Sequence, residues 1–165
     1  MSQARRRAIS GVVLLGVAAL GGCSDGSDAD GACGPTTRES LDPAYLVHVL
    51  DGAEGLEYTS DPPTSGPHQP GPEVSGVVAE PLTAPVQVGV LERGDVLIQY
   101  DPSLGAAAAA ELDAVAADHV VVAPNPDLPA PIVATAWLYK RTCDAVDADA
   151  LRAFSDERAG NGPEG

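Results

Sequence analysis

The segment that most restricts the fold is DPPTSGPHQPGP, residues 61–72. Five of these twelve residues are proline and two are glycine. Proline lacks a backbone N–H and fixes φ, so the segment cannot lie inside a β-sheet. We therefore expect a long loop over residues 54–72, which holds the histidine at position 68 in a stiff turn.

The N-terminal residues predict export and a lipid anchor. Three arginines at positions 5–7 precede an apolar run over residues 9–20, which is shorter than the about 20 residues of a spanning helix and is typical of a signal peptide. The following LGGC, ending at Cys23, resembles the lipobox of bacterial lipoproteins. We expect a signal peptide over residues 1–22, lipid on Cys23, and a flexible acidic tether over residues 23–32. The expected location is the extracytoplasmic face of the cell membrane; an ordinary secreted protein is the alternative.

The charge of the chain argues against nucleic acid as a partner. The sequence has 9 basic and 24 acidic residues, and loss of the signal peptide leaves 6 and 24, a net charge of −18. Such a surface repels phosphate backbones and anionic lipid head groups. We interpret the excess negative charge as a determinant of solubility; a cation-binding surface is the alternative.

The remaining cysteines predict a disulfide. With lipid on Cys23, Cys33 and Cys143 are an even pair in an oxidising compartment. Their spacing fits neither a CxxC redox motif nor a zinc site. A bond between them would close a loop of roughly a hundred residues and contribute about 4 kcal/mol to stability in the chain-entropy model.

Residues 33–162 have the length of one domain, and residues 163–165 are expected to fray. The expected elements, in chain order, are a helix over 42–52, an edge strand over 75–82, paired strands over 86–91 and 95–100, a helix over 102–119, strands over 119–123 and 131–142, and a helix over 146–158. A helix between two strands suggests a parallel crossover, and the short link after the second strand suggests an antiparallel pair. We expect an α+β fold with a mixed sheet, a β-α-β-β-α core order and helices packed on the sheet.

Few residues suggest chemistry. Ser65 and His68 are three positions apart, but no GxSxG elbow and no acid in a recognisable place accompanies them, so a Ser-Gly-Pro turn is the simpler interpretation. No catalytic residue is predicted. Glu92 and Arg93 lie either in a charged hairpin turn, with Gly94 and Asp95 at its tip, or against a pocket. His119, next to a strand, is interpreted as structural.

A metal site is a further hypothesis. Zinc and copper sites need several imidazole or thiolate ligands, and the chain has three histidines. His48 and His68 are the two that could meet, with help from Tyr58, Asp61 or another acid.

Several stretches resemble a known family. They are YTSDPPTSGPH at 58–68, VQVGVLERGDVLIQY at 86–100, IVATAW at 132–137, an AF helix and a terminal GPE. Together they are similar to the domain of unknown function 3105, a family of mostly bacterial extracytoplasmic proteins, and the resemblance spans residues 44–164.

The family pattern contains a histidine cluster that looks like a metal site. His48 and His68 match its first two histidines. The third motif, HxLEHG, is only half matched, because Gly89 and Arg93 stand in place of its two histidines. A guanidinium is a fixed cation that cannot ligate, so the resemblance implies that a family metal site is partly lost here.

The resemblance implies no activity. We expect a non-enzymatic module of the cell envelope, which binds an unknown envelope protein or small ligand through a pocket around Tyr58, His68, Glu92 and Arg93 and needs no cofactor. The first alternative is a copper- or zinc-binding protein that uses His48 and His68. An envelope enzyme is the last alternative.

Overall fold

The computed structural model describes residues 31–164. The expected signal peptide, the lipid on Cys23 and residues 23–30 of the expected tether lie outside the described residues. Within 31–164, no helix is long and apolar enough to cross a membrane.

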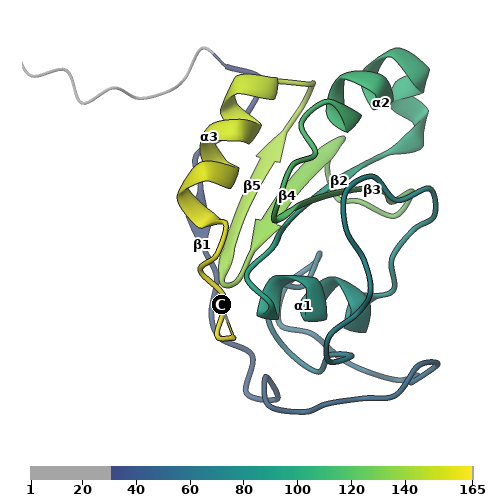
Figure 1. The fold of residues 1–165 in the computed structure, drawn as a ribbon, viewed down its shortest axis with the longest axis vertical. Helices are drawn as coiled ribbons and strands as arrows, with labels where there is room; N and C mark the ends of the chain where they lie inside the picture. The colour runs from purple at the N-terminus through teal and green to yellow at the C-terminus, as the bar shows by residue number, and fades with distance from the viewer. Residues whose placement is uncertain (1–30, 165) are drawn as a thin grey trace, which may run out of the picture.

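The domain is built on a mixed sheet of five strands in the order β1-β5-β4-β2-β3 (Figure 1). The strands are β1 (Thr37–Arg38), β2 (Val96–Tyr100), β3 (Val120–Pro124), β4 (Ile132–Ala136) and β5 (Tyr139–Cys143). The pair β2–β3 is parallel and is connected through the 3-10 helix η1 (Pro102–Leu104) and α2 (Gly105–Asp113); the other pairs are antiparallel. The predicted α+β class with a mixed sheet is therefore confirmed.

Helices cover both faces of the sheet. Val96 and Ile98 of β2 belong to a core with side chains of α2 and of α3 (Ala148–Arg158), whereas Leu97 belongs to a second core with α1 (Ala84–Glu92). The alternation follows from the period of two in a strand. The second core is completed from loops, by Val74 among others, so the proline-rich region and α1 form one layer.

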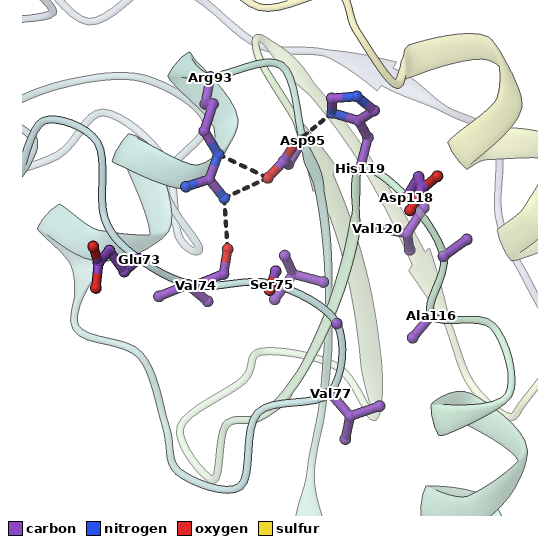
Figure 2. Close-up of a pocket in the computed structure, with 13 residues that line it drawn as sticks. Glu73, Val74, Ser75, Val77, Arg93, Asp95, Ala116, Asp118, His119 and Val120 are labelled. Carbon is purple, nitrogen blue, oxygen red and sulfur yellow. Dashed lines mark hydrogen bonds and ion pairs between the residues drawn. The ribbon is translucent and has the colours of Figure 1, made fainter.

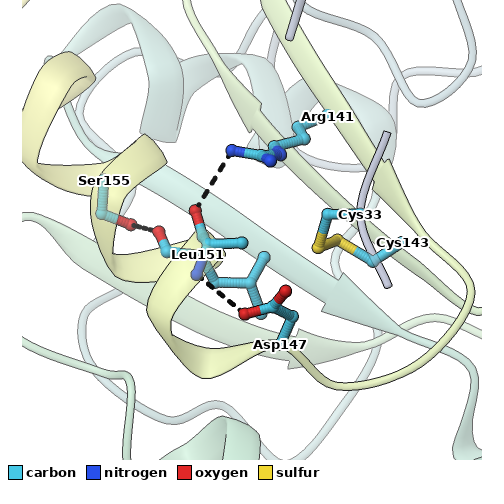
Figure 3. Close-up of a disulfide and its surroundings, with 7 residues drawn as sticks. Cys33, Arg141, Cys143, Asp147, Leu151 and Ser155 are labelled. Atoms are coloured by element: carbon cyan, nitrogen blue, oxygen red, sulfur yellow. Dashed lines mark hydrogen bonds between the residues drawn. A yellow bond between two sulfur atoms is a disulfide. The ribbon is translucent and has the colours of Figure 1, made fainter. Parts of the chain in front are cut away.

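The predicted disulfide between Cys33 and Cys143 is present (Figure 3). It joins the segment before β1 to the end of β5, and it is buried in the same core as Leu151 of α3. Two backbone hydrogen bonds flank it. Gly34 N–H donates to the Thr142 carbonyl (2.9 Å), and Asp144 N–H donates to the Ala32 carbonyl (2.8 Å). The bond therefore fastens the start of the domain to the middle of the fold.

The predicted helix over residues 42–52 is wrong. The backbone groups on either side of His48 bond to His68 across a β-bridge, which removes them from any helical ladder. A helix would also need burial for its apolar face, and Leu46 and Leu50 are 74% and 87% exposed.

The predicted strand over residues 86–91 and its hairpin turn are also wrong, because α1 covers these residues. Thr83 is the N-cap and a proline occupies the first turn, where its fixed φ suits a helix. The side chains from Gln87 to Glu92 are all buried. A short continuous apolar run is compatible with a buried strand and a buried helix alike, so periodicity did not separate them.

Three smaller corrections concern the sheet. Residues 131–142 form two strands, because the chain turns at Leu138 with a φ of 63°. β4 pairs with β2 rather than with β3, since both ends of the preceding link, at Asn125 and Pro131, bond to the end of β2. Residues 75–82 contribute a single bridge to β3 instead of a strand.

Candidate metal centre

His48 and His68 lie side by side. Val49 N–H donates to the His68 carbonyl (2.8 Å), and His68 N–H donates to the Val47 carbonyl (3.0 Å). This parallel bridge sets the two imidazole rings 4.8 Å apart, centroid to centroid, at 71°. The first ring is exposed and the second is fully buried, so the pair connects the surface with the interior.

The loop that carries His68 is fixed by buried polar groups. Asp42 N–H donates to the Ser65 hydroxyl (2.9 Å), and the Asp42 carboxylate accepts from Thr59 N–H (3.2 Å). The Tyr58 hydroxyl donates to the Pro67 carbonyl (2.9 Å). Burial, together with the charge of Asp42, raises the pKa of Tyr58 to about 12. Tyr58 and Ser65 therefore position the loop.

Glu92, at the end of α1, supplies the third side chain. Its Oε2 lies 2.7 Å from Nε2 of His68, and His48 completes a group whose candidate ligand atoms all lie within 4.8 Å of one another. Within residues 31–164, this is the group of histidine, cysteine and acidic side chains that could hold a metal ion. It combines two imidazoles with one carboxylate.

The two ring nitrogens of His68 have different surroundings. Nδ1 of His68 lies 3.0 Å from the Gly66 carbonyl, and since a carbonyl only accepts, Nδ1 carries a hydrogen. Nε2 faces Oε2 of Glu92 at the distance of an ion pair, yet neither atom has a hydrogen bond of acceptable geometry in the described part of the chain. Two buried polar atoms without partners are uncommon and call for an explanation.

The electrostatics of Glu92 are those of a buried carboxyl group. Burial raises the pKa of Glu92 above its ordinary value; His68 and His48 act in the opposite direction, and the charge of Glu164 adds to the rise. A positive ion in this position would relieve the cost of the buried carboxylate.

Arg93 does not join this group. Its guanidinium donates to the Asp95 carboxylate, to the Pro72 carbonyl and, at 2.7 Å, to the Val74 carbonyl. Figure 2 shows Asp95 between Arg93 and His119, where Nδ1 of His119 donates to Oδ1 of Asp95 (2.8 Å). The four residues of the expected pocket are therefore divided: His68 and Glu92 face each other, Tyr58 braces the loop, and Arg93 lies elsewhere with its charge paired.

Gly89 lies against the His68 loop. A Cβ at this position would overlap the carbonyl of Gln69 and press on the ring of Pro72. Gln69 N–H also donates to the Pro85 carbonyl (3.0 Å), so loop and helix pack backbone to backbone. Glycine is what allows the loop to approach α1 this closely.

Sequence reasoning missed Glu92 as a candidate ligand. The strand assigned to residues 86–91 put Glu92 in a hairpin turn or against a pocket, whereas the end of a buried helix turns it toward His68. His119 was interpreted as structural, and it lines a surface cavity of about 1020 Å³ together with Glu73, Arg93 and Asp95 (Figure 2). The one signal for Glu92 in the sequence was the partial match of residues 89–94 to the family motif HxLEHG.

Fold and site together define a class: a single α+β domain in which a proline-stiffened loop and a buried helix bring two imidazoles and a carboxylate together. A comparison with protein families matches residues 48–165 to "Protein of unknown function (DUF3105)". The chain belongs to this family, and the matched region begins at His48 and contains all three side chains of the cluster. Comparisons with curated proteins and with solved structures find no match.

Proposed function

We propose that this protein is a metal-binding protein of the cell envelope, which holds a divalent transition-metal ion between His48, His68 and Glu92. Zinc is the ion that we expect. The observation that carries the proposal is the pair of buried atoms, Nε2 of His68 and Oε2 of Glu92, which face each other without a hydrogen bond.

The donor set supports zinc. Imidazole nitrogen and carboxylate oxygen are zinc ligands at about 2.0 to 2.2 Å, so two of them on one tetrahedral ion are about 3.3 to 3.6 Å apart. The 2.7 Å separation of the two buried atoms is shorter than this, so the two side chains would separate slightly to admit an ion. Ligating histidines commonly donate their other ring N–H to a carbonyl, as Nδ1 of His68 does to Gly66. Copper(II) and iron(II) accept the same ligand types and are the competing ions.

The N-terminal sequence supports a location outside the cytoplasm. A lipid on Cys23 would hold the domain at the membrane, and the net charge of −18 that remains after removal of the signal peptide would attract cations to it. Cys23→Ala is expected to release the protein into the medium, as measured by immunoblotting of cell and medium fractions. Retention on the cells would contradict the anchor.

Zinc titration tests the metal site. Full-length protein stripped with EDTA should gain about 2.7 kcal/mol of stability at zinc concentrations 100 times Kd, which is roughly 10 °C in Tm for a domain of this size. His48→Ala should remove this gain while leaving the fold intact, because His48 is exposed. The matched control is His119→Asn, since asparagine tolerates the positive φ of 61° at that position. Equal zinc shifts in all three proteins would end the proposal.

A second candidate function, the binding of a small ligand, is favoured by the cavity near Arg93. Its volume of about 1020 Å³ is sufficient for a small organic molecule, and the valines at 74 and 77 and the carboxylates of Glu73 and Asp118 line it. These walls suit an apolar amine. Amide chemical shifts of Gly76 and Ala117 should move when small alkylamines are added; their invariance would reject this candidate.

A further inference from the structure

The segment after α3 returns to the end of α1, beside the proposed ligand Glu92. Gly160 N–H donates to the Gly94 carbonyl (2.8 Å), and Glu164 N–H donates to the Glu92 carbonyl (3.2 Å). Figure 1 places the last described residues below α3, on the side of α1. These residues were expected to begin fraying at 163, but the backbone of Glu164 is bonded to the helix end that carries the ligand.

Close backbone packing fixes this segment. A Cβ at Gly162 would overlap the Glu92 carbonyl and the backbone of Gly94. A residue with a side chain at 162 would therefore have to push the segment away. Glycine here lets residues 160–164 lie directly on the turn that follows Glu92, which determines where the Glu164 side chain begins.

The Glu164 carboxylate is available for an ion. Glu164 is exposed, and within residues 31–164 its carboxylate takes part in none of the hydrogen bonds or ion pairs of the structure. This carboxylate is not among the ligand atoms that lie within 4.8 Å of one another, so the exposed side chain would rotate toward the cluster to reach an ion.

The proposed cluster is one ligand short of a closed site. Structural zinc sites have four protein ligands in a tetrahedron, whereas three protein ligands leave a position for water or substrate. His48, His68 and Glu92 provide three. A second carboxylate would also neutralise the two positive charges of the ion, since both imidazoles are neutral when they ligate.

We propose that Glu164 is the fourth ligand, carried to the ion by the segment Gly160–Glu164. This inference rests on the proposed zinc function and makes the site a closed, four-coordinate one. The segment acts as a strap: its glycines set the position of the backbone, and the glutamate closes the coordination sphere.

Glu164→Gln tests the inference, with Glu111→Gln as the matched control. Both changes remove one exposed negative charge, and Glu111 lies on α2, at the opposite end of the molecule from the strap (Figure 1). In isothermal titration with Zn²⁺, Glu164→Gln should bind at least about tenfold more weakly than wild type, and Glu111→Gln should match wild type. With Co²⁺ as a spectroscopic probe, the visible absorption of Glu164→Gln should differ from that of wild type in position and intensity, because water would replace the carboxylate.

A second variant separates the strap from the ligand. Gly162→Ala keeps every ligand but displaces the segment, so it should weaken zinc binding in the same direction as Glu164→Gln. Wild-type zinc affinity in both Glu164→Gln and Gly162→Ala would overturn the fourth ligand while leaving the three-ligand site standing. Absence of zinc binding in the wild-type protein would overturn both.

Discussion

Two histidine–carboxylate pairs flank the end of α1, and they differ in what surrounds them. In the first, His68 and Glu92 are buried, and their facing atoms have no hydrogen-bond partner. In the second, Asp95 accepts from Arg93 and from His119, whose side chain is 58% exposed. An imidazole and a carboxylate thus form a buried contact without a hydrogen bond in one place, and a hydrogen-bonded structural contact in the other. Burial and unpaired atoms, rather than residue type, distinguish the candidate site.

The largest expected effect is that substitution of His68, but not of His119, abolishes the stabilisation by zinc. His68→Asn removes Nε2, while its amide can still donate to the Gly66 carbonyl in place of Nδ1. We expect loss of the zinc-dependent rise of roughly 10 °C in Tm, with that rise preserved in His119→Asn. Differential scanning fluorimetry in EDTA and in zinc measures both. A zinc response that depends on His119 and not on His68 would reverse the comparison.

Arg93→Ala should affect stability and leave the metal site unchanged. The substitution removes charged hydrogen bonds to Asp95 and to the carbonyls of the 72–74 segment, so we expect a loss of about 1.5 to 3 kcal/mol in urea unfolding. Zinc affinity should stay within about twofold of wild type, because the guanidinium is paired away from His68. A zinc affinity that rises tenfold would instead indicate that the arginine repels the ion.

The smallest expected effect concerns Glu92 in the metal-free protein. Its raised pKa means that the folded protein holds the proton more tightly than the unfolded chain does. The loss of stability caused by ionising Glu92 is absent below the pKa of the unfolded chain, about 4.3. It grows as the pH rises from there through the pKa of the folded protein. Glu92→Gln should therefore raise the apo Tm slightly at pH 8, where its amide can also donate to Nε2 of His68, and the gain should vanish near pH 4.

Thermal unfolding in EDTA from pH 4 to pH 8 measures this difference, and zinc titration of the same variant should show that binding is lost. Opposite signs for stability and metal affinity are the signature of a site kept for a ligand. If Glu92→Gln lowers the apo Tm at pH 8 instead, the His68–Glu92 pair is a stabilising ion pair and its burial needs no metal to explain it.

Much of the sheet was predictable, because local patterns agree with the tertiary environment there. β2 and β3 are short apolar runs on either side of an alanine-rich helix. Asp147 is the N-cap of α3, and its carboxylate accepts from Ala150 N–H (Figure 3). The region before β2 was predicted poorly. Its apolar residues fit helix and strand alike, and long-range backbone pairing with His68 overrode the helix signals at residues 42–52.

The sequence by itself determined the unusual parts: a loop that proline keeps out of the sheet, a disulfide from an even pair of cysteines, and a family resemblance that singled out His48 and His68. Covalent geometry and cysteine count act locally, so they can be read without the fold. Only the tertiary structure decided that Glu92 meets His68 while Arg93 turns to Asp95. Neighbouring residues near the end of a helix project in different directions, and which direction leads into a buried site depends on what packs against the helix. The segment at Glu164, some seventy residues further along the chain, reaches the same place because the chain after α3 returns to the end of α1.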